Sequence, residues 1–318
     1  MKQKVLTFRS MDDAELEPSE LVPSPDSMLV RTICSTISPG TELFCIREAV
    51  KSGNSTRPGY ILTGKDEKGK RNFLFPAMKE SSGCHCDVKA VGKDSILVPL
   101  PEGISDEESG FLRFINIGLH AFLRIPKLPE KVCVIGLGPV GNMACQTAQI
   151  LGCEIIGVDV SDRRRATAGD CGIRSTIRPE DPARKDKEFD LVIDTVCSSS
   201  TLASASAILK DHGECSMIGI VKDGDLKASD IMRQIWNRNL VFRSGWEMLN
   251  PLKKQAGDPQ VSTEDNLLRA INWMKSGLYS VKPLITGVIP AEIGAIKDSY
   301  SRLDKKPDEN MCFVIRWQ

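Results

Sequence analysis

Three glycines in one short loop point most directly to chemistry in this sequence. They lie in Gly136-Leu137-Gly138-Pro139-Val140-Gly141, a G-x-G-x-x-G motif. In such a loop the first glycine permits a tight turn, the second lets the backbone approach a pyrophosphate, and the third lets the next helix pack on the preceding strand. A helix N-terminus at the loop adds free N–H groups and partial positive charge. The motif therefore predicts a pyrophosphate-binding site.

The residues on either side of the loop supply the elements that such a site requires. An apolar run, Val132–Ile135, precedes the loop and predicts a strand that is buried on both faces. Apolar residues then recur at helical spacing until Gly152 ends the predicted helix. A second apolar strand, Ile155–Val158, leads to Asp159, whose carboxylate can accept hydrogen bonds from ribose hydroxyls. We predict that this βαβ unit binds a dinucleotide; the alternative is a βαβ unit that binds nothing or another nucleotide.

Composition excludes several classes of partner. Lys plus Arg and Asp plus Glu number 42 each, so no excess of positive charge favours nucleic acid or an anionic membrane. The N-terminal stretch lacks the apolar core of a signal peptide, and no apolar run approaches the roughly 20 residues of a membrane span. A length of 318 residues predicts two domains.

The eleven cysteines are scattered along the chain. Cys133, Cys145, Cys153 and Cys215 lie in apolar runs and are expected to be small buried residues. No C-x-x-C motif occurs. The segment Cys84–Cys86, with a histidine at its centre, suggests a metal, but such ligands without a distant partner pair seldom form a structural zinc site. We expect a reducing, cytoplasmic location.

The pattern of elements predicts an α/β protein with two kinds of unit. Before residue 118 the chain is β-rich, with predicted strands at Lys4–Arg9, Ser27–Ile33, Asp87–Ala90 and Ser95–Val98, a charged hairpin turn at Lys65–Lys70 and a helix starting at Ser105. From Lys131 strands alternate with helices, which predicts a doubly wound parallel sheet with right-handed crossovers.

The later elements complete both units. The sheet continues with predicted strands Phe189–Val196, Gly213–Ile220 and Leu240–Gly245, between helices Arg163–Asp170 and Thr201–Leu209. A helix at Glu264–Ser276 is predicted to place Leu267, Leu268, Ile271 and Met274 on one face. The tail is predicted to form strands Lys282–Ile289 and Met311–Trp317 around a helix at Ala291–Leu303, and to return to the first unit.

Several short motifs, in this order and spacing, resemble the medium-chain dehydrogenases/reductases over essentially the whole chain. They are Ile37-Ser38-Pro39-Gly40-Thr41-Glu42-Leu43, Pro58-Gly59-Tyr60, Leu97-Val98-Pro99-Leu100-Pro101, Gly118-Leu119-His120-Ala121, the glycine loop, and Val281-Lys282-Pro283-Leu284-Ile285-Thr286. The resemblance implies a GroES-like catalytic domain over 1–117 and 278–318 and a Rossmann domain over 118–277. It also implies hydride transfer between a nicotinamide and a carbonyl/alcohol pair.

The chain departs from this family where zinc-dependent members bind catalytic zinc. Those members use a Cys in the first loop, a His in a Pro-Gly-His-Glu stretch, and a Glu or Cys before the cofactor domain. The matching positions here are Ser38, Tyr60 and Arg113, and Ile61 replaces the Glu after the His. A hydroxyl, a phenol and a guanidinium do not supply the deprotonated ligands that zinc requires. The cysteine-rich lobe for structural zinc is also missing, so we expect a zinc-free protein.

Without zinc, another group must stabilise and protonate the oxygen of the reacting carbonyl. Tyr60 is the first candidate donor, and Arg113 is a cation that lowers the pKa of its phenol or binds an anionic substrate group. Equally weighted alternatives to these catalytic roles are that Tyr60 is a packing residue and that Arg113 forms a surface or domain-bridging ion pair.

Further candidates follow from the same resemblance. Thr41 occupies a position of the proton relay in relatives, with a turn role as the alternative. His120 lies in a segment that approaches the cofactor in relatives, although packing is the favoured interpretation, and Glu42 is expected to be structural. The candidate catalytic residues are thus Tyr60, Arg113, Thr41, Ser38 and His120.

The cofactor preference depends on charges after the second strand. Asp159 repels a 2′-phosphate, whereas Arg163–Arg165 could accept one, so we expect NAD, with NADP as the alternative. The predicted cofactor-binding residues are Gly136, Gly138, Pro139, Val140, Gly141, Asp159 and Arg163, and no metal ligand is predicted.

The sequence as a whole predicts a zinc-independent oxidoreductase that transfers a hydride between NAD(H) and a polar alcohol or ketone, by analogy a sugar- or cyclitol-like compound. The alternatives are an NADPH-dependent reductase of activated double bonds or quinones, and a non-catalytic dinucleotide-binding protein. The expected partners are a small-molecule substrate and a second copy in a homodimer, with no nucleic acid and no membrane.

Overall fold

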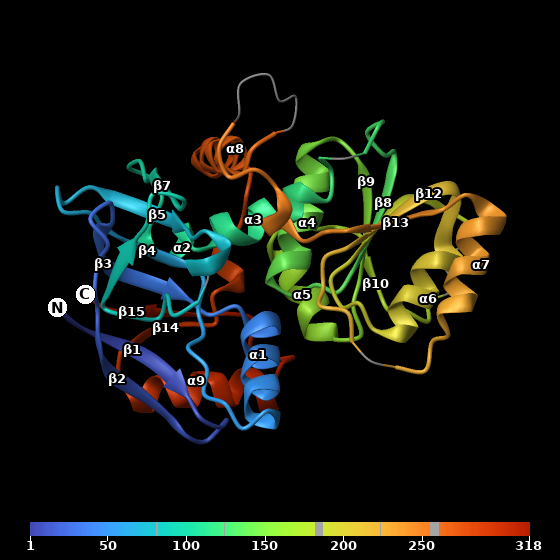
Figure 1. Ribbon diagram of the computed structural model, residues 1–318. Coiled ribbons are helices and arrows are strands. Elements are labelled where there is room, and N and C mark those ends of the chain that lie inside the picture. The colour runs from blue at the N-terminus through green and yellow to red at the C-terminus, as the bar shows by residue number, and fades with distance from the viewer. Residues whose placement is uncertain (81, 124, 182–186, 223, 255–260) are drawn as a thin grey trace. The chain divides into compact units, whose positions relative to one another are not determined.

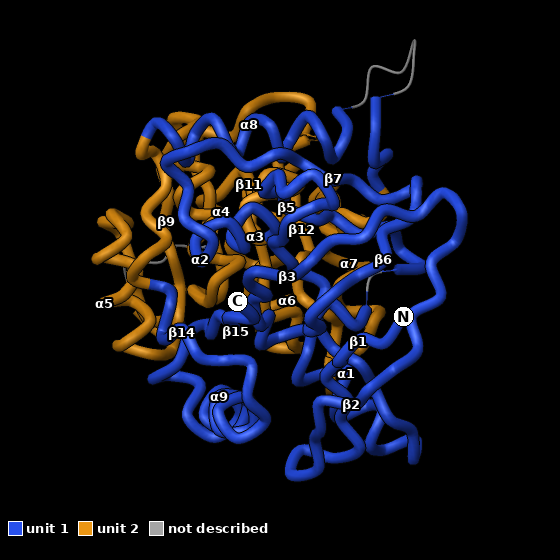
Figure 2. Tube along the Cα trace, turned by 90° about the vertical axis from the view of Figure 1, so that its left-hand side faces the viewer, with its two compact units in different colours: residues 1–113, 250–276, 284–318 blue, residues 114–249, 277–283 orange. Residues whose placement is uncertain are grey.

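The computed structural model describes residues 1–80, 82–123, 125–181, 187–222, 224–254 and 261–318. The chain forms two compact units, coloured separately in Figure 2. The first comprises residues 1–113, 250–276 and 284–318, and the second comprises residues 114–249 and 277–283. Residues 250–276, which the sequence pattern assigned to the dinucleotide-binding unit, are grouped with the first unit.

The second unit is built on a six-stranded sheet in the order β10-β9-β8-β11-β12-β13, and every strand pair in it is parallel. Numbered along the chain, this is the order 3-2-1-4-5-6 of doubly wound dinucleotide-binding sheets. The predicted doubly wound parallel sheet is therefore confirmed. Its strands are β8 (Lys131–Ile135), β9 (Glu154–Val158), β10 (Thr176–Ile177), β11 (Phe189–Asp194), β12 (Leu209–Met217) and β13 (Val241–Ser244).

Helices cover both faces of this sheet (Figure 1). They are α4 (Pro139–Ile150), α5 (Asp162–Asp170), α6 (Ser199–Ile208) and α7 (Ala228–Arg238), and the border between the units falls within α3 (Phe111–His120). The sequence pattern did not predict α7, and its residues are exposed or half-buried without a buried apolar stripe.

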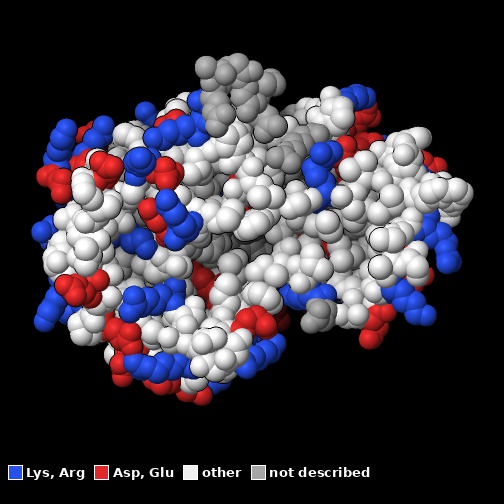
Figure 3. All heavy atoms as spheres, in the orientation of Figure 1, with Lys and Arg blue, Asp and Glu red and all other residues white. Residues whose placement is uncertain are grey.

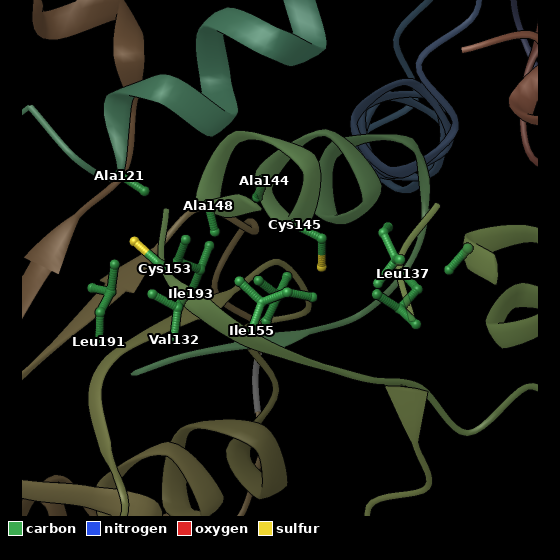
Figure 4. Close-up of a cluster of buried hydrophobic side chains, with 13 residues drawn as sticks. Ala121, Val132, Leu137, Ala144, Cys145, Ala148, Cys153, Ile155, Leu191 and Ile193 are labelled. Atoms are coloured by element: carbon green, nitrogen blue, oxygen red, sulfur yellow. The ribbon is translucent and has the colours of Figure 1, made fainter. Parts of the chain in front are cut away.

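Small side chains let α4 approach the sheet closely. Figure 4 shows one face of α4 against the strands, with Ala144, Cys145 and Ala148 above Val132, Ile155 and Ile193. Each large apolar side chain that is fully buried here contributes about 1.5–3 kcal/mol. This packing fixes the start of α4, and with it the glycine loop, relative to β8.

The first unit contains a sheet in the order β14-β15-β3-β4-β5-β7, with β6 also paired to β3, and a separate antiparallel pair, β1-β2. The strands are β1 (Lys2–Phe8), β2 (Ala14–Glu20), β3 (Met28–Thr36), β4 (Leu62–Lys65), β5 (Arg71–Phe75), β6 (Val88–Val91), β7 (Ile96–Pro99), β14 (Gly287–Pro290) and β15 (Phe313–Arg316). The tail strand β15 lies beside β3, and the predicted hairpin between β4 and β5 is present. Its helices are α1 (Pro39–Lys51), α2 (Asp106–Ser109), α8 (Thr263–Lys275) and α9 (Ile293–Lys305).

Some elements of the first unit differ from the sequence expectations. Strand β2 was not predicted because its sequence, AELEPSE, is polar and contains a proline. Residues Lys282–Leu284 form a 3₁₀ turn instead of a strand, because Pro283 lacks an N–H for a ladder. On α8, Leu268 is exposed, and the buried face consists of Thr263, Asn266, Leu267, Ala270 and Ile271.

A compact apolar cluster joins α1 and α9 beneath the strands of the first unit. Ile46 of α1 and Tyr300 of α9 are fully buried in it together with Phe8 and Phe313. The rings of Phe8 and Tyr300 lie 4.8 Å apart at an angle of 60°. This cluster holds the N-terminal end of α1 close to the tail of the chain.

Two surface properties bear on possible partners. No helix among the described residues combines the length and the apolar character that crossing a bilayer requires. On the face shown in Figure 3, basic and acidic side chains are interspersed, without a broad area of one sign. This distribution agrees with the equal numbers of positive and negative side chains.

Candidate functional site

The glycine loop connects β8 to α4 and depends on glycine at two positions. Gly136 has φ +91°, and a Cβ there would lie 2.4 Å from Oγ1 of Thr195. A Cβ at Gly141 would lie 1.8 Å from the carbonyl oxygen of Gly136. Both positions therefore exclude a side chain, because backbone or buried neighbours occupy the space. The tight turn and the close packing expected of the first and third glycines are present.

Gly138 differs, because an added Cβ would meet no heavy atom within 4 Å. It is the N-cap of α4, it has no side chain to cap the helix, and Pro139 follows it as the first helical residue. The N-terminal N–H groups of α4 thus receive no capping hydrogen bond from a side chain of the N-cap residue, and the space beside the Cα of Gly138 is open. An anionic pyrophosphate fits this arrangement, since it needs both a close backbone and hydrogen-bond donors.

Asp159 follows β9 and is 6% exposed. One carboxylate oxygen accepts the N–H of Leu137 at 2.8 Å, and the other accepts the N–H of Ser161 at 2.8 Å. A carboxylate has about four acceptor positions, so each oxygen retains one for a further donor. The carboxylate thus holds the glycine loop through the N–H of Leu137, and it can still accept hydrogen bonds from ribose hydroxyls.

The arginines after Asp159 are largely engaged with acidic groups. Arg165 donates to the Asp159 carbonyl and pairs with Asp162, and Arg178 also pairs with Asp162. Arg164 lies 3.9 Å from the Asp159 carboxylate. Arg163, the predicted cofactor-binding arginine, is exposed on α5. The basic cluster is therefore offset by two aspartates, and this weakens its attraction for a phosphate.

In the first unit, Ser38 and Tyr60 are brought together. The Ser38 hydroxyl and the Tyr60 phenol are 2.6 Å apart and share a hydrogen bond. Ser38 is the N-cap of α1, but its side chain does not cap the helix. Tyr60 is half-buried and precedes β4 by two residues.

Arg113 completes this group of side chains. It is 3% exposed, and the carbon of its guanidinium lies 3.9 Å from the ring centre of Phe75 and 4.9 Å from that of Tyr60. Aromatic faces attract a cation at such distances, more strongly where water is excluded. Ser38, Tyr60 and Arg113, expected together from the positions of zinc ligands in relatives, are thus neighbours, and their roles remain a prediction.

Behind this group lies a buried carboxylate that sequence reasoning assigned only a structural part. Glu42 accepts the backbone N–H of Ser38 at 2.7 Å and a hydrogen bond from the Tyr300 hydroxyl. The Glu42 carboxylate also lies 2.9 Å from Nε2 of His85. The sequence signal was weak: a Glu in the first turn of a helix and a His in a Cys-His-Cys segment.

The other two candidates have no described contact with this group. Thr41 is half-buried in the first turn of α1, and no described hydrogen bond links its hydroxyl to Ser38 or Tyr60. His120 is buried at the end of α3, in the second unit. Their catalytic assignment stays a prediction.

The three side chains at the positions that match zinc ligands in relatives do not form a zinc ligand set. Ser38, Tyr60 and Arg113 offer no thiolate, imidazole or carboxylate. In the Cys84–Cys86 segment both thiols are buried, which raises their pKa values, that of Cys86 to about 12. The described residues contain no group of three or more His, Cys, Asp or Glu side chains arranged to hold a metal.

Comparison with known proteins finds similarity to dehydrogenases. Residues 139–250 match the family described as zinc-binding dehydrogenase. Sorbitol dehydrogenase 1 of Saccharomyces cerevisiae is 31% identical over 204 residues, which cover 61% of this chain and 54% of the yeast protein. The chain thus spans about half the length of the curated relatives that it matches.

Solved structures share the fold at low sequence identity. L-idonate 5-dehydrogenase of Escherichia coli has a TM-score of 0.80 at 15% identity, covering 100% of this chain and 99% of that one. A short chain alcohol dehydrogenase from E. coli CFT073, solved with NADH, has a TM-score of 0.79 at 16% identity, covering 99% of each chain. These structures support the combination of a GroES-like domain and a Rossmann domain.

The open space above Gly138 leads to a prediction. Gly138→Val should leave the melting temperature nearly unchanged, because a Cβ there meets no heavy atom within 4 Å, but should weaken dinucleotide binding by more than about tenfold. Calorimetric titration with NADH and a thermal melt measure both effects. Gly169→Val is the matched control, since a Cβ at Gly169 on α5 also meets nothing. Unchanged affinity in folded Gly138→Val would place the dinucleotide elsewhere.

Proposed function

We propose that this chain, which is similar to zinc-binding dehydrogenases, is a medium-chain oxidoreductase that transfers a hydride between NAD(H) and a polar alcohol or ketone without zinc. The observation that carries this proposal is the start of α4 at Gly138, which has no side-chain cap and where an added Cβ would meet no heavy atom within 4 Å. Asp159 holds the neighbouring loop by accepting the N–H of Leu137. When bound, the nicotinamide donates or accepts the hydride. The protein's part is to bind, orient and exchange a proton with the substrate.

The residues of the second unit are proposed to hold the dinucleotide. The backbone at Gly138, Val140 and Gly141 would donate to the pyrophosphate at the start of α4, where Pro139 contributes no N–H. Gly136 would shape the turn, and Asp159 would accept hydrogen bonds from the ribose hydroxyls.

The charges around Asp159 support a preference for NAD over NADP. A 2′-phosphate would meet the buried carboxylate of Asp159, and the nearby Arg165 and Arg178 are already paired with Asp162. Arg164 lies 3.9 Å from the Asp159 carboxylate, and Arg163 is exposed. An exposed cation offsets a buried like-charge repulsion poorly.

The substrate class is proposed from chemistry and similarity together. Two proteins similar to this chain are named sorbitol dehydrogenase and L-idonate 5-dehydrogenase, so they act on a polyhydroxylated compound. The polar group at Ser38 and Tyr60 offers hydroxyls to such a compound, and buried Arg113 offers a cation. We propose a sugar- or polyol-like alcohol or ketone.

Tyr60 is proposed as the proton donor during carbonyl reduction. As the hydride arrives at carbon, the carbonyl oxygen gains negative charge and takes the phenolic proton, which leaves a phenolate on Tyr60. The hydroxyl of Ser38 lies within 2.6 Å to hydrogen-bond that phenolate. The guanidinium of Arg113, 4.9 Å from the ring centre, is a positive charge that favours it as well. In the oxidative direction the same phenolate accepts the proton of the alcohol.

A homodimer is proposed from the free edge of the second unit's sheet. Strand β13 is the last strand of the described sheet, and its outer edge has unpaired backbone groups. Val241, Trp246 and Leu249, on or just after β13, are exposed apolar side chains. Light scattering should give twice the chain mass of 34.9 kDa, and a monomer at micromolar concentration would contradict this proposal.

The charge balance at Asp159 yields a test of cofactor choice. Wild type should bind NADH at least about tenfold more tightly than NADPH, and Asp159→Asn should narrow that ratio, since the repelling charge is gone. Asp162→Asn should raise NADPH affinity by releasing Arg165 and Arg178. Fluorescence titration of both nucleotides measures this, and tighter NADPH binding by wild type would reject the preference.

Zinc independence is tested by composition and by chelation. Protein purified without chelator should contain far less than one zinc per chain in elemental analysis, because no ligand set is present at Ser38, Tyr60 and Arg113. Activity should survive dialysis against a chelator. One zinc per chain, together with loss of turnover on chelation, would overturn the zinc-independent mechanism.

Removal of the phenol tests the proton donor. Tyr60→Phe should keep NADH affinity and lower kcat for carbonyl reduction by about 10²–10⁴, the usual effect of losing a general acid. One limb of the pH profile should disappear with it. Arg113→Met, which keeps much of the buried volume, should raise KM more than it lowers kcat if Arg113 holds a polar substrate group. Wild-type turnover in folded Tyr60→Phe would rule out the assigned role.

A further inference from the structure

A buried hydrogen-bond network lies directly behind Ser38 and Tyr60, and the proton transfer proposed above does not use it. Its centre is Glu42, 2% exposed, with His85 and Tyr300, both 0% exposed. All these residues belong to the first unit, although they come from α1, from the segment before β6, and from α9.

The carboxylate of Glu42 has three described donors. They are the Ser38 backbone N–H at 2.7 Å, Nε2 of His85 at 2.9 Å, and the hydroxyl of Tyr300. A buried carboxylate is costly unless it is hydrogen-bonded, and three donors are what such a group requires. Glu42 is consequently held in one orientation, and the N–H of Ser38 is held with it.

His85 is oriented by a second set of contacts. Its Nδ1 lies 2.7 Å from the Ser35 hydroxyl, whose oxygen accepts the indole N–H of Trp317 at 2.9 Å. Because the Glu42 carboxylate can only accept, Nε2 of His85 carries the proton that faces it, and the Ser35 O–H can donate to Nδ1. This hydrogen-bond pattern satisfies each polar atom of the imidazole.

His85 also contacts the residue before Tyr60. A Cβ at Gly59, whose φ is +94°, would lie 2.7 Å from Cδ2 of His85, so the backbone at Gly59 lies directly on the imidazole ring. The Cys84 N–H donates to the Gly59 carbonyl at 3.0 Å. The His85 segment therefore fixes the backbone that carries Tyr60, while Glu42 fixes the backbone that carries Ser38.

The start of α1 explains why Ser38 needs this help. An N-cap serine usually accepts a backbone N–H of the first turn with its own hydroxyl. Here the hydroxyl reaches Tyr60 instead, and the Glu42 carboxylate binds the Ser38 N–H while the Glu42 N–H binds the Ser38 carbonyl at 2.9 Å. Glu42 thus holds the backbone of Ser38 at both ends, and the side chain is released from capping.

We propose that Glu42, held by His85 and Tyr300, is a positioning residue that sets the Ser38 hydroxyl against the Tyr60 phenol. The significance for turnover rests on the proposed function, in which Tyr60 exchanges the proton. The geometric claim itself, that Glu42 acts on Tyr60 through Ser38, can be measured without any substrate.

The small number of tyrosines makes that measurement possible. The chain has three, and burial raises the pKa values of Tyr279 and Tyr300. Phenolate absorbance that develops below about pH 11 is therefore assigned to Tyr60, and its loss in Tyr60→Phe checks the assignment. The midpoint of this titration reports how well the Ser38 hydroxyl stabilises the Tyr60 phenolate.

The sign of the shift separates positioning from a plain charge effect. Removal of a nearby negative charge by Glu42→Gln would lower the Tyr60 midpoint. Loss of the Ser38 hydrogen bond would raise it, by about one pH unit, as Ser38→Ala should do directly. We expect the rise in Glu42→Gln, a smaller rise in Tyr300→Phe, and no further change when Glu42→Gln is added to Ser38→Ala.

A matched control lies on the same helix. Glu48 of α1 is exposed and pairs with Lys51, so Glu48→Gln makes the same chemical change without touching the network and should leave the midpoint unchanged. If Glu42→Gln fails to fold, Tyr300→Phe removes one donor to the carboxylate while keeping the buried ring.

The outcomes distinguish the positioning claim from the proposed function. A lowered or unchanged midpoint in both variants, or an equal shift in the Ser38→Ala background, would overturn the positioning role. With a substrate in hand, Glu42→Gln should lower kcat about tenfold or more at unchanged KM. If the midpoint shifts as expected while Tyr60→Phe retains wild-type kcat, the positioning role stands and the proton-donor role of Tyr60 falls.

Discussion

The buried negative charge of Glu42 is the constraint on which the first unit depends. Its donors come from Ser38, four residues before it, and from His85 and Tyr300, which are 43 and 258 residues away. Breaking such a buried arrangement by removing one partner typically costs about 3–5 kcal/mol. The strands around it, the start of α1 and the packing of α9 must therefore all be in place together, and the Ser38–Tyr60 pair inherits its geometry from them.

The second unit meets a different constraint, in which backbone approaches backbone. The space between the loop carbonyl of Gly136 and the first turn of α4 admits no Cβ at Gly141, and the Asp159 carboxylate bonds the loop N–H of Leu137. Neither contact involves a ligand. The loop is thus already shaped before any dinucleotide arrives, and binding would cost little in ordering.

Much of this architecture could be predicted from the sequence, because it follows from short-range patterns. Apolar runs broken by Gly-rich turns located β8, β9 and β11, and the spacing of three glycines located the loop between β8 and α4. The resemblance to a family predicted that Ser38, Tyr60 and Arg113 lie together. Polar β2 lacked an apolar pattern that would reveal it. In α7 the apolar residues Ile231, Met232, Ile235 and Trp236 do recur at helical spacing, but none of them is buried, and the sequence analysis did not recognise the helix. The partners of Glu42 could not be foreseen either, because hydrogen bonds between residues so distant in sequence depend on tertiary packing.

The path of the chain through its two units has a consequence for synthesis. The strands of the second unit's sheet lie in one continuous stretch of sequence, from β8 to β13. The first unit also needs α9 and β15, which are synthesised after this stretch. On the ribosome, the dinucleotide-binding unit can thus close first, since domains fold as units while translation proceeds. Until Tyr300 is synthesised, the apolar faces of β1 and α1 lack the packing of α9, and the carboxylate of Glu42 lacks the Tyr300 hydroxyl as a donor. The nascent first unit is therefore the part most exposed to aggregation during synthesis.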